Sequence, residues 1–276
     1  MNLRRLATKS IQLASRTKHD ANPDSMVFND RTVFDRKDLK SWYRSVMFGP
    51  STLAHLAVGP ASLRQSIQIL QSLEPDDYLH YLLAYYDTGI KRFGASWVYA
   101  DILTVLAATA RLIEPRSYLE IGVRRGRSMA MVAAICRECE IIGIDLWASD
   151  YADMSNPGPD FVRAEMNKLG HVGQLELIRG NSHVIVPDFF NKHADKYFDL
   201  ITIDGDHSER GAEQDLCNVL PRLKIGGVLV FDDICHPLHP YLRDVWHQVV
   251  GTDSRFLTWQ FTELGYGVAF AIKALP

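Results

Sequence analysis

The stretch S-Y-L-E-I-G-V-R-R-G-R-S, residues 117–128, decides the expected fold. It opens with an apolar run typical of a buried strand. Gly122 and Gly126 then mark a turn into a helix expected from residue 126 to residue 138. Glycines at such a turn permit a sharp bend and let a ligand approach the main chain closely. The stretch therefore predicts a strand, a ligand-binding turn and a helix.

Further apolar runs follow, and helical patterns separate them. The runs cover residues 141–145, 175–178, 198–204 and 228–233, and helices are expected near 159–169, 182–191, 209–223 and 239–250. Strands that are apolar on both faces and alternate with helices favour a doubly wound α/β fold, a parallel sheet with helices on both sides. The final runs, 256–262 and 266–273, lie too close together for a helical crossover, so they must pair as an antiparallel hairpin.

The chain before residue 117 has helical periodicity. Helices are expected at residues 61–73, 76–86 and 96–113, with Gly89 and Gly94 breaking the second pattern and Ser96 capping the third. We therefore expect two parts, a mainly helical N-terminal region over residues 1–95 and an α/β domain over residues 96–276. The first part is expected to cover a substrate pocket or to form the surface of a homo-oligomer.

Composition places the chain among ordinary globular proteins. Its 276 residues are 47% hydrophobic and 23% charged. Lysine and arginine total 30 against 33 acidic residues, a balance that argues against a general nucleic-acid binder. The longest apolar stretches are shorter than the ~20 residues of a membrane-spanning helix. The lone C-x-x-C at Cys136 and Cys139 lacks the other ligands of a zinc site, so we expect reduced thiols and a cytoplasmic protein.

The first 19 residues contain no acid and carry Arg4, Arg5, Lys9, Arg16 and Lys18 between apolar side chains. This pattern is typical of a transit peptide or a membrane-surface helix. A solvated leader has the same composition, and it is the interpretation that we favour. No long apolar segment follows, so a secretory signal is not expected.

Asp145 ends the second apolar run, 23 residues after Gly122. An acid at this distance can accept hydrogen bonds from both ribose hydroxyls of a bound cofactor. Dinucleotide enzymes prefer G-x-G-x-x-G, but Arg124 stands at the position of the second glycine. S-adenosylmethionine has no phosphate, and its cationic groups need acidic or carbonyl partners, which Glu120 can supply. The pattern therefore favours S-adenosylmethionine over NAD, with a turn that binds no ligand as the alternative.

Other residues of the expected cofactor site have two interpretations. Asn181 or Ser182, after the third run, could bond the adenine edge or cap the next helix, and these roles are compatible. Trp147 could stack on the adenine or belong to the core. The site as predicted also includes Gly122, Gly126, Ser128 and Asp204.

Three aspartates are expected to meet at one edge of the sheet. Asp204 ends one strand, and Asp232 and Asp233 end the strand expected beside it. Ligands bind beyond the carboxyl ends of parallel strands, and clustered carboxylates repel one another unless a cation joins them. An all-oxygen ligand set suits Mg²⁺ or Mn²⁺. The alternative is that Asp206 and Asp232 cap helices while the other acids face water.

Three histidines follow these acids. His207 lies three residues after Asp204, where a neutral imidazole could take a proton from a hydroxyl whose acidity the metal raises. A capping or packed histidine is the alternative. His236 and His239 lie in the proline-containing segment I-C-H-P-L-H-P, and either could contact substrate or serve only the loop.

These motifs resemble the class I S-adenosylmethionine-dependent methyltransferases, over roughly residues 96–276. The motifs are E-x-G-x-x-x-G at 120–126, Asp145, I-D-G-D-H at 203–207 and F-D-D at 231–233. Within that class the chain is similar to the metal-dependent sugar O-methyltransferases of the macrocin and mycinamicin type, and more distantly to the catechol O-methyltransferase group. The resemblance implies a Rossmann-like seven-stranded sheet whose last strand is antiparallel.

The resemblance also implies roles for single residues. Asp204, Asp232 and Asp233 would hold Mg²⁺, His207 would be the base, and Glu120 and Asp145 would contact S-adenosylmethionine. We therefore expect an O-methyltransferase that acts on a hydroxyl of a small molecule or of a glycosyl group. The rival interpretations are a metal-independent or non-catalytic relative that binds S-adenosylmethionine, and an NAD-dependent oxidoreductase.

Overall fold

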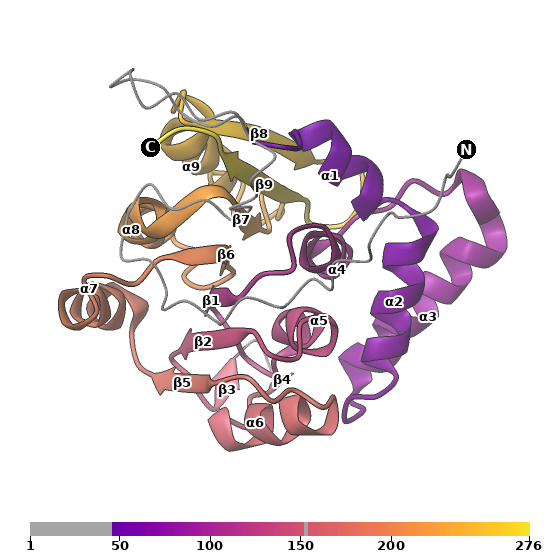
Figure 1. The fold of residues 1–276 in the computed structure, drawn as a ribbon. Coiled ribbons are helices and arrows are strands. Elements are labelled where there is room, and N and C mark those ends of the chain that lie inside the picture. The colour runs from indigo at the N-terminus through magenta and orange to yellow at the C-terminus, as the bar shows by residue number, and fades with distance from the viewer. Residues whose placement is uncertain (1–45, 152–153) are drawn as a thin grey trace, which may run out of the picture.

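A computed structural model describes residues 46–151 and 154–276 of the chain (Figure 1). The basic segment 1–19 and the first half of the predicted helical region 1–95 lie outside the described residues. None of the helices in the part that the structure describes combines the length and the apolar content needed to cross a lipid bilayer.

The centre of the fold is the predicted sheet of seven strands, in the order β5-β2-β1-β6-β7-β9-β8. The strands are β1 (Ser117–Ile121), β2 (Glu140–Asp145), β5 (Leu175–Arg179), β6 (Phe198–Ile203), β7 (Leu223–Asp232), β8 (Phe256–Phe261) and β9 (Val268–Lys273). β9 pairs antiparallel with both of its neighbours, while the pairs among β5, β2, β1, β6 and β7 are parallel. The predicted fold class and the terminal hairpin are therefore confirmed. A short antiparallel pair, β3 (Asp150–Tyr151) and β4 (Met154–Ser155), was not expected.

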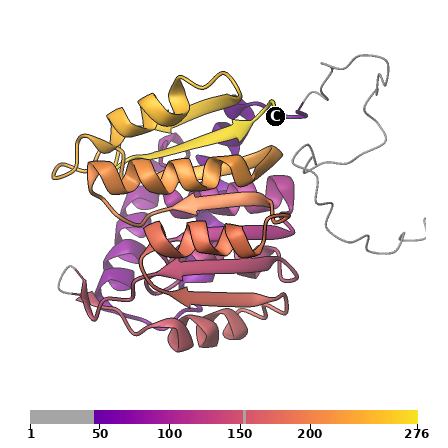
Figure 2. The same ribbon diagram turned by 90° about the vertical axis from the view of Figure 1, so that its left-hand side faces the viewer.

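Helices cover both faces of the sheet (Figures 1 and 2). One face carries α1 (Pro50–Ala57), α4 (Ile102–Ile113) and α5 (Arg127–Ile135), and the other carries α7 (Ser182–Lys192), α8 (Glu209–Val219) and α9 (Leu242–Trp246). α6 (Pro159–Lys168) lies beside the edge strand β5, while α2 (Pro60–Leu70) and α3 (Asp77–Phe93) lie outside α4 and α5 (Figure 1). Short turns follow three helices, 3₁₀ at Gly94–Ser96 and Leu220–Arg222 and π at His247–Gly251.

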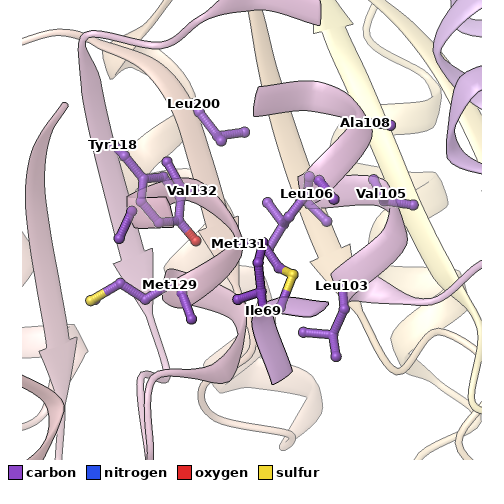
Figure 3. Close-up of a cluster of buried hydrophobic side chains, with 14 of the residues drawn as sticks. Ile69, Leu103, Val105, Leu106, Ala108, Tyr118, Met129, Met131, Val132 and Leu200 are labelled. Atoms are coloured by element: carbon purple, nitrogen blue, oxygen red, sulfur yellow. The ribbon is translucent and has the colours of Figure 1, made fainter. Parts of the chain in front are cut away.

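The strands bury alternate residues in two separate cores. Tyr118 and Leu200 face the α4 and α5 side, where Leu106 and Met131 meet them (Figure 3). Their sequence neighbours, such as Leu119, lie in the core on the other side of the sheet. Complete burial of a side chain of this size contributes about 1.5–3 kcal/mol, so the two cores hold the strand ends in fixed positions.

Two predictions in the helical region were wrong. α4 begins at Ile102, not Ser96, because the Asp101 carboxylate accepts a hydrogen bond from the Thr104 N–H at 2.9 Å and completes a capping box. Gly89 does not break α3, which continues to Phe93. Its hydrogen instead makes room for the Trp97 ring, since a Cβ at this position would lie 2.2 Å from ring carbons.

Candidate active site

The glycine turn after β1 lies against the end of β6. Gly122 has φ of 89°, and a Cβ there would lie 1.8 Å from the carbonyl oxygen of Asp204. The Gly122 N–H donates to the Ile144 carbonyl at 2.9 Å, and the Asp204 N–H donates to the Ile121 carbonyl at 2.8 Å. Only glycine fits this conformation and this approach, so the turn brings the ends of β1, β2 and β6 together.

Asp145 fixes the shape of this turn. Its Oδ2 accepts a hydrogen bond from the Arg124 backbone N–H at 2.7 Å, and its Oδ1 accepts one from the Trp147 backbone N–H. The Trp147 indole N–H donates to the Arg124 carbonyl at 2.9 Å, and its side chain is only 2% exposed. Trp147 is therefore a core residue of this turn. The neighbouring Leu146, which was not predicted as a site residue, is 61% exposed beside Asp145.

Glu120 lies at the end of β1 with no exposed surface. Its carboxylate accepts hydrogen bonds from the Tyr118 hydroxyl at 2.6 Å and from the Ser128 hydroxyl at 2.5 Å. Burial raises the pKa of Glu120 to about 8, although both hydrogen bonds oppose that shift. An acid in this state holds a proton near neutral pH, and a cationic group brought beside it would favour its ionised form.

The segment after β5 forms the start of α7. The Asn181 side-chain oxygen Oδ1 accepts a hydrogen bond from the His183 N–H at 2.9 Å, so Asn181 is the helix cap that the sequence allowed, and Ser182 is the first residue of the helix. A similar arrangement precedes α8, where Ser208 caps the helix and Asp206 accepts from the Ser208 N–H at 2.8 Å.

The structure brings three ligand-type side chains together beyond β6 and β7. Nε2 of His207 lies 2.9 Å from Asp233 Oδ2 and 3.6 Å from Asp204 Oδ1. One ligand atom from each of these residues lies within 4.8 Å of the others. Asp233 reaches this position from a left-handed backbone conformation, with φ of 60°. Asp232 was expected in the group, but it pairs with Val268 in the sheet and lies outside the group as it stands.

The charges of this group perturb one another. Burial and the neighbouring charge of Asp233 raise the pKa of Asp204, and burial with the charges of Asp233 and Asp204 raises that of Asp232. Burial lowers the pKa of His207, but its hydrogen bond with Asp233 and the charge of Asp204 outweigh that effect and raise it. The carboxylates repel one another, and they lie close to an imidazole. Such a set of oxygen and nitrogen donors is one that a divalent cation fits.

A row of rings leads away from this group. The ring centroids of His207 and His239 are 5.5 Å apart, those of His239 and His236 are 4.8 Å apart, and those of His236 and Tyr266 are 4.4 Å apart. Tyr241 supports the row, because its hydroxyl donates to the His207 carbonyl at 2.9 Å and lies 2.8 Å from His239 Nδ1. Neither tyrosine was predicted as a site residue, since neither belongs to a recognisable motif.

The start of α3 also contacts the site. Asp76, the N-cap of α3, pairs with Arg125 at 3.0 Å and with Arg127 at 2.5 Å, both in or beside the glycine turn. Tyr78 follows, with the Arg127 guanidinium 5.1 Å from its ring centroid. Partial burial and the charges of Asp232 and Asp101 raise the pKa of Tyr78 to about 12. The start of α3 therefore lies against the glycine turn, which nothing in the sequence indicated.

Comparison with known proteins agrees with this arrangement. Residues 119–234 match the family model described as a methyltransferase domain. CalS11, a TDP-rhamnose 3'-O-methyltransferase of calicheamicin biosynthesis, is 20% identical with a TM-score of 0.50, and the match covers 78% of this chain and 95% of CalS11. TomG, an O-methyltransferase from Streptomyces achromogenes solved with S-adenosylmethionine, is 19% identical with a TM-score of 0.51, over 73% and 92% of the two chains. An O-methyltransferase from Bacillus cereus is 14% identical with a TM-score of 0.50, over 78% and 91%. No protein with a curated description matches the sequence.

The order of the strands and the matched domain are those of the class I methyltransferase fold. Over residues 119–234 the chain is similar to methyltransferase domains, and in fold it resembles solved O-methyltransferases, among them a sugar O-methyltransferase.

Proposed function

We propose that the chain transfers the methyl group of S-adenosylmethionine to a hydroxyl of a small molecule or a sugar, with the help of Mg²⁺ or Mn²⁺. The observation that carries the proposal is the meeting of Asp204, His207 and Asp233 beside the glycine turn. Gly122 packs directly on the Asp204 backbone, so the residues that would hold donor and acceptor are a few ångströms apart.

The cofactor fits residues that the turn already orders. Asp145 keeps free lone pairs on both oxygens, because each accepts only one backbone hydrogen bond among the described residues, and these would bind the ribose hydroxyls. Leu146 offers an exposed apolar surface to the adenine, and Asn181 and Ser182 lie along its edge. Glu120, with Gly122, Gly126 and Ser128 near it, would hold the cationic methionine end. When bound, S-adenosylmethionine supplies an electrophilic methyl group.

The acid group, which consists of Asp204, Asp232 and Asp233, would hold the cation. Asp204 and Asp233 offer carboxylate oxygens, and Asp232 at the end of β7 would complete the oxygen set by a change of side-chain rotamer. A divalent cation at this position raises the acidity of an acceptor hydroxyl. His207 accepts the released proton at Nε2, which requires that its hydrogen bond with Asp233 be given up. His236 and His239 would border the acceptor.

Two of the structural neighbours support the choice of acceptor. CalS11 is described as a TDP-rhamnose 3'-O-methyltransferase and TomG as an O-methyltransferase involved in tomaymycin synthesis. Alongside this we propose a cytoplasmic homo-oligomer in which residues 1–95 form an accessory region and residues 96–276 the catalytic domain, with no nucleic-acid partner.

A metal-independent reaction is the second candidate, and one observation favours it. The 2.9 Å contact of His207 with Asp233 is the geometry of a base oriented by a carboxylate, which needs no cation. Methyl transfer from radiolabelled S-adenosylmethionine to a panel of glycosides and phenols, with Mg²⁺ or with EDTA, separates the two. Transfer that EDTA abolishes and Mg²⁺ restores supports the metal; transfer that survives EDTA supports the second candidate. No transfer to any hydroxyl contradicts both.

A further inference from the structure

A line of aromatic rings runs along one face of α3. The ring centroids of Tyr78 and Tyr81 are 6.2 Å apart, those of Tyr81 and Tyr85 are 6.3 Å apart, and those of Tyr85 and Trp97 are 5.9 Å apart. Tyr78 is 42% exposed and Tyr81 is 62% exposed. Rings exposed in a continuous row are unusual on a surface that binds nothing. The row begins beside the glycine turn, where the Arg127 guanidinium lies 5.1 Å from the Tyr78 ring centroid.

The row ends at a cavity of about 340 Å³. Its apolar walls are Tyr85, Phe93 and Trp97 from α3 and the segment after it, and Leu264 from the turn between β8 and β9. Gly89 belongs to its lining and is the residue that makes room for the Trp97 ring. The charged side chain in the lining is Arg92, which forms no ion pair within the described residues.

The second row of rings reaches the same place. His207, His239, His236 and Tyr266 lead from the acid group to the β8–β9 turn, and Leu264 of that turn lines the cavity. Both rows of rings therefore lead from the site toward this cavity. Tyr85 follows Tyr78 by seven residues, which is ~10 Å along a helix, so the path is longer than a single sugar ring.

We propose that this cavity is a subsite for the far end of the methyl acceptor, and that it binds a flat-faced ring that carries an anionic group such as phosphate. Aromatic side chains stack on planar rings and on the flat faces of sugars, and an unpaired arginine recognises phosphate by a bidentate, charge-assisted contact. The inference rests on the proposed function, because it takes the reacting hydroxyl to lie at the acid group. It makes the acceptor a molecule of at least two rings.

The test is equilibrium binding to the full-length protein in the presence of S-adenosylhomocysteine, read by calorimetry. The probes are 1-naphthyl phosphate, glucose 1-phosphate, 1-naphthol and inorganic phosphate. Binding of 1-naphthyl phosphate or glucose 1-phosphate at least tenfold tighter than that of 1-naphthol and inorganic phosphate supports the subsite. Which of the two phosphates binds more tightly shows whether the subsite prefers an aromatic ring or a sugar. Equal binding of all four, or no binding, overturns it.

Variants assign the binding to the cavity. Arg92→Ala should weaken the phosphate probe at least tenfold, and Thr88→Trp, which fills the cavity, should do the same. Lys91→Ala is the matched control, because Lys91 neighbours Arg92 on α3 and pairs with Asp87 instead. Unchanged affinity in Arg92→Ala overturns the proposal. S-adenosylhomocysteine has no methyl group to transfer, so the calorimetric titration tests the subsite alone. The proposed function is tested separately, by the methyl-transfer assay.

Discussion

The phenolic hydroxyl of Tyr241 lies 2.9 Å from the backbone carbonyl oxygen of His207. The two residues are 34 positions apart in the chain, and the bond joins the loop before α9 to the loop after β6. The same hydroxyl lies 2.8 Å from His239 Nδ1, so it contacts the backbone of one histidine and the ring of the other. Tyr241→Phe should reduce kcat about 3–10-fold, since it removes a net ~1 kcal/mol hydrogen bond but no reacting group. Steady-state kinetics checks this; an unchanged kcat would contradict the positioning role.

His207→Ala should cut turnover by ~10²–10⁴-fold, the usual contribution of a general base. Cofactor affinity should stay nearly unchanged, because the imidazole contacts the acids and not the glycine turn. Methyl-transfer rates and calorimetric titration with S-adenosylhomocysteine measure the two quantities. His80→Ala, at an exposed position of α3, is the control and should match the wild type. Parallel loss of affinity and turnover would be evidence against the assigned role.

Asp145→Ala should weaken S-adenosylhomocysteine at least tenfold, because it removes both the ribose acceptor and the two backbone hydrogen bonds that shape the turn. The melting temperature should also fall by a few degrees, since the Arg124 and Trp147 N–H groups lose their partner. Calorimetry and thermal unfolding report these changes. Asp188→Ala removes an exposed acid on α7 and serves as the control. Wild-type affinity in Asp145→Ala would refute the ribose assignment.

Glu120 should make stability depend on pH. Its pKa is raised to about 8 in the fold, so its favourable contribution is complete below the unfolded pKa near 4.5 and is lost as pH rises through about 8. Relative to Glu120→Gln, which stays neutral, the wild type should lose at least about 1 kcal/mol between pH 5 and pH 9, or ~2–4 °C in melting temperature. Thermal unfolding without cofactor measures it, and parallel curves for the two proteins would exclude the effect.

Removal of single acids should show which of them hold the metal. Asp204→Asn and Asp233→Asn should each weaken Mn²⁺ at least tenfold, measured by electron paramagnetic resonance of the free ion. Asp232→Asn should weaken it similarly only if the rotamer change that we propose takes place. Asp206→Asn is the control, because its carboxylate already accepts the Ser208 N–H. Undiminished Mn²⁺ binding in both Asp204→Asn and Asp233→Asn would remove the metal site.

The sheet was predictable because its strands are apolar on both faces, and that pattern has few other interpretations. The start of α4 was not, because Ser96 and Asp101 are both good caps and only the tertiary packing of Trp97 and Tyr99 decides between them. The acid group was predicted in outline from strand ends. Which side chains belong to it depends on the left-handed backbone conformation of Asp233, which no local sequence pattern predicts. The contact of α3 with the site could not be predicted either, because it is a tertiary contact between distant parts of the chain.

The ion pairs of Asp76 with Arg125 and Arg127 join the start of α3 to the glycine turn. Should the acceptor bind along α3 as we propose, any gain in affinity that it gives the donor must be matched by an equal gain for the acceptor. The donor and the acceptor should then bind with synergy, and the helical region acts as the reciprocal link between them.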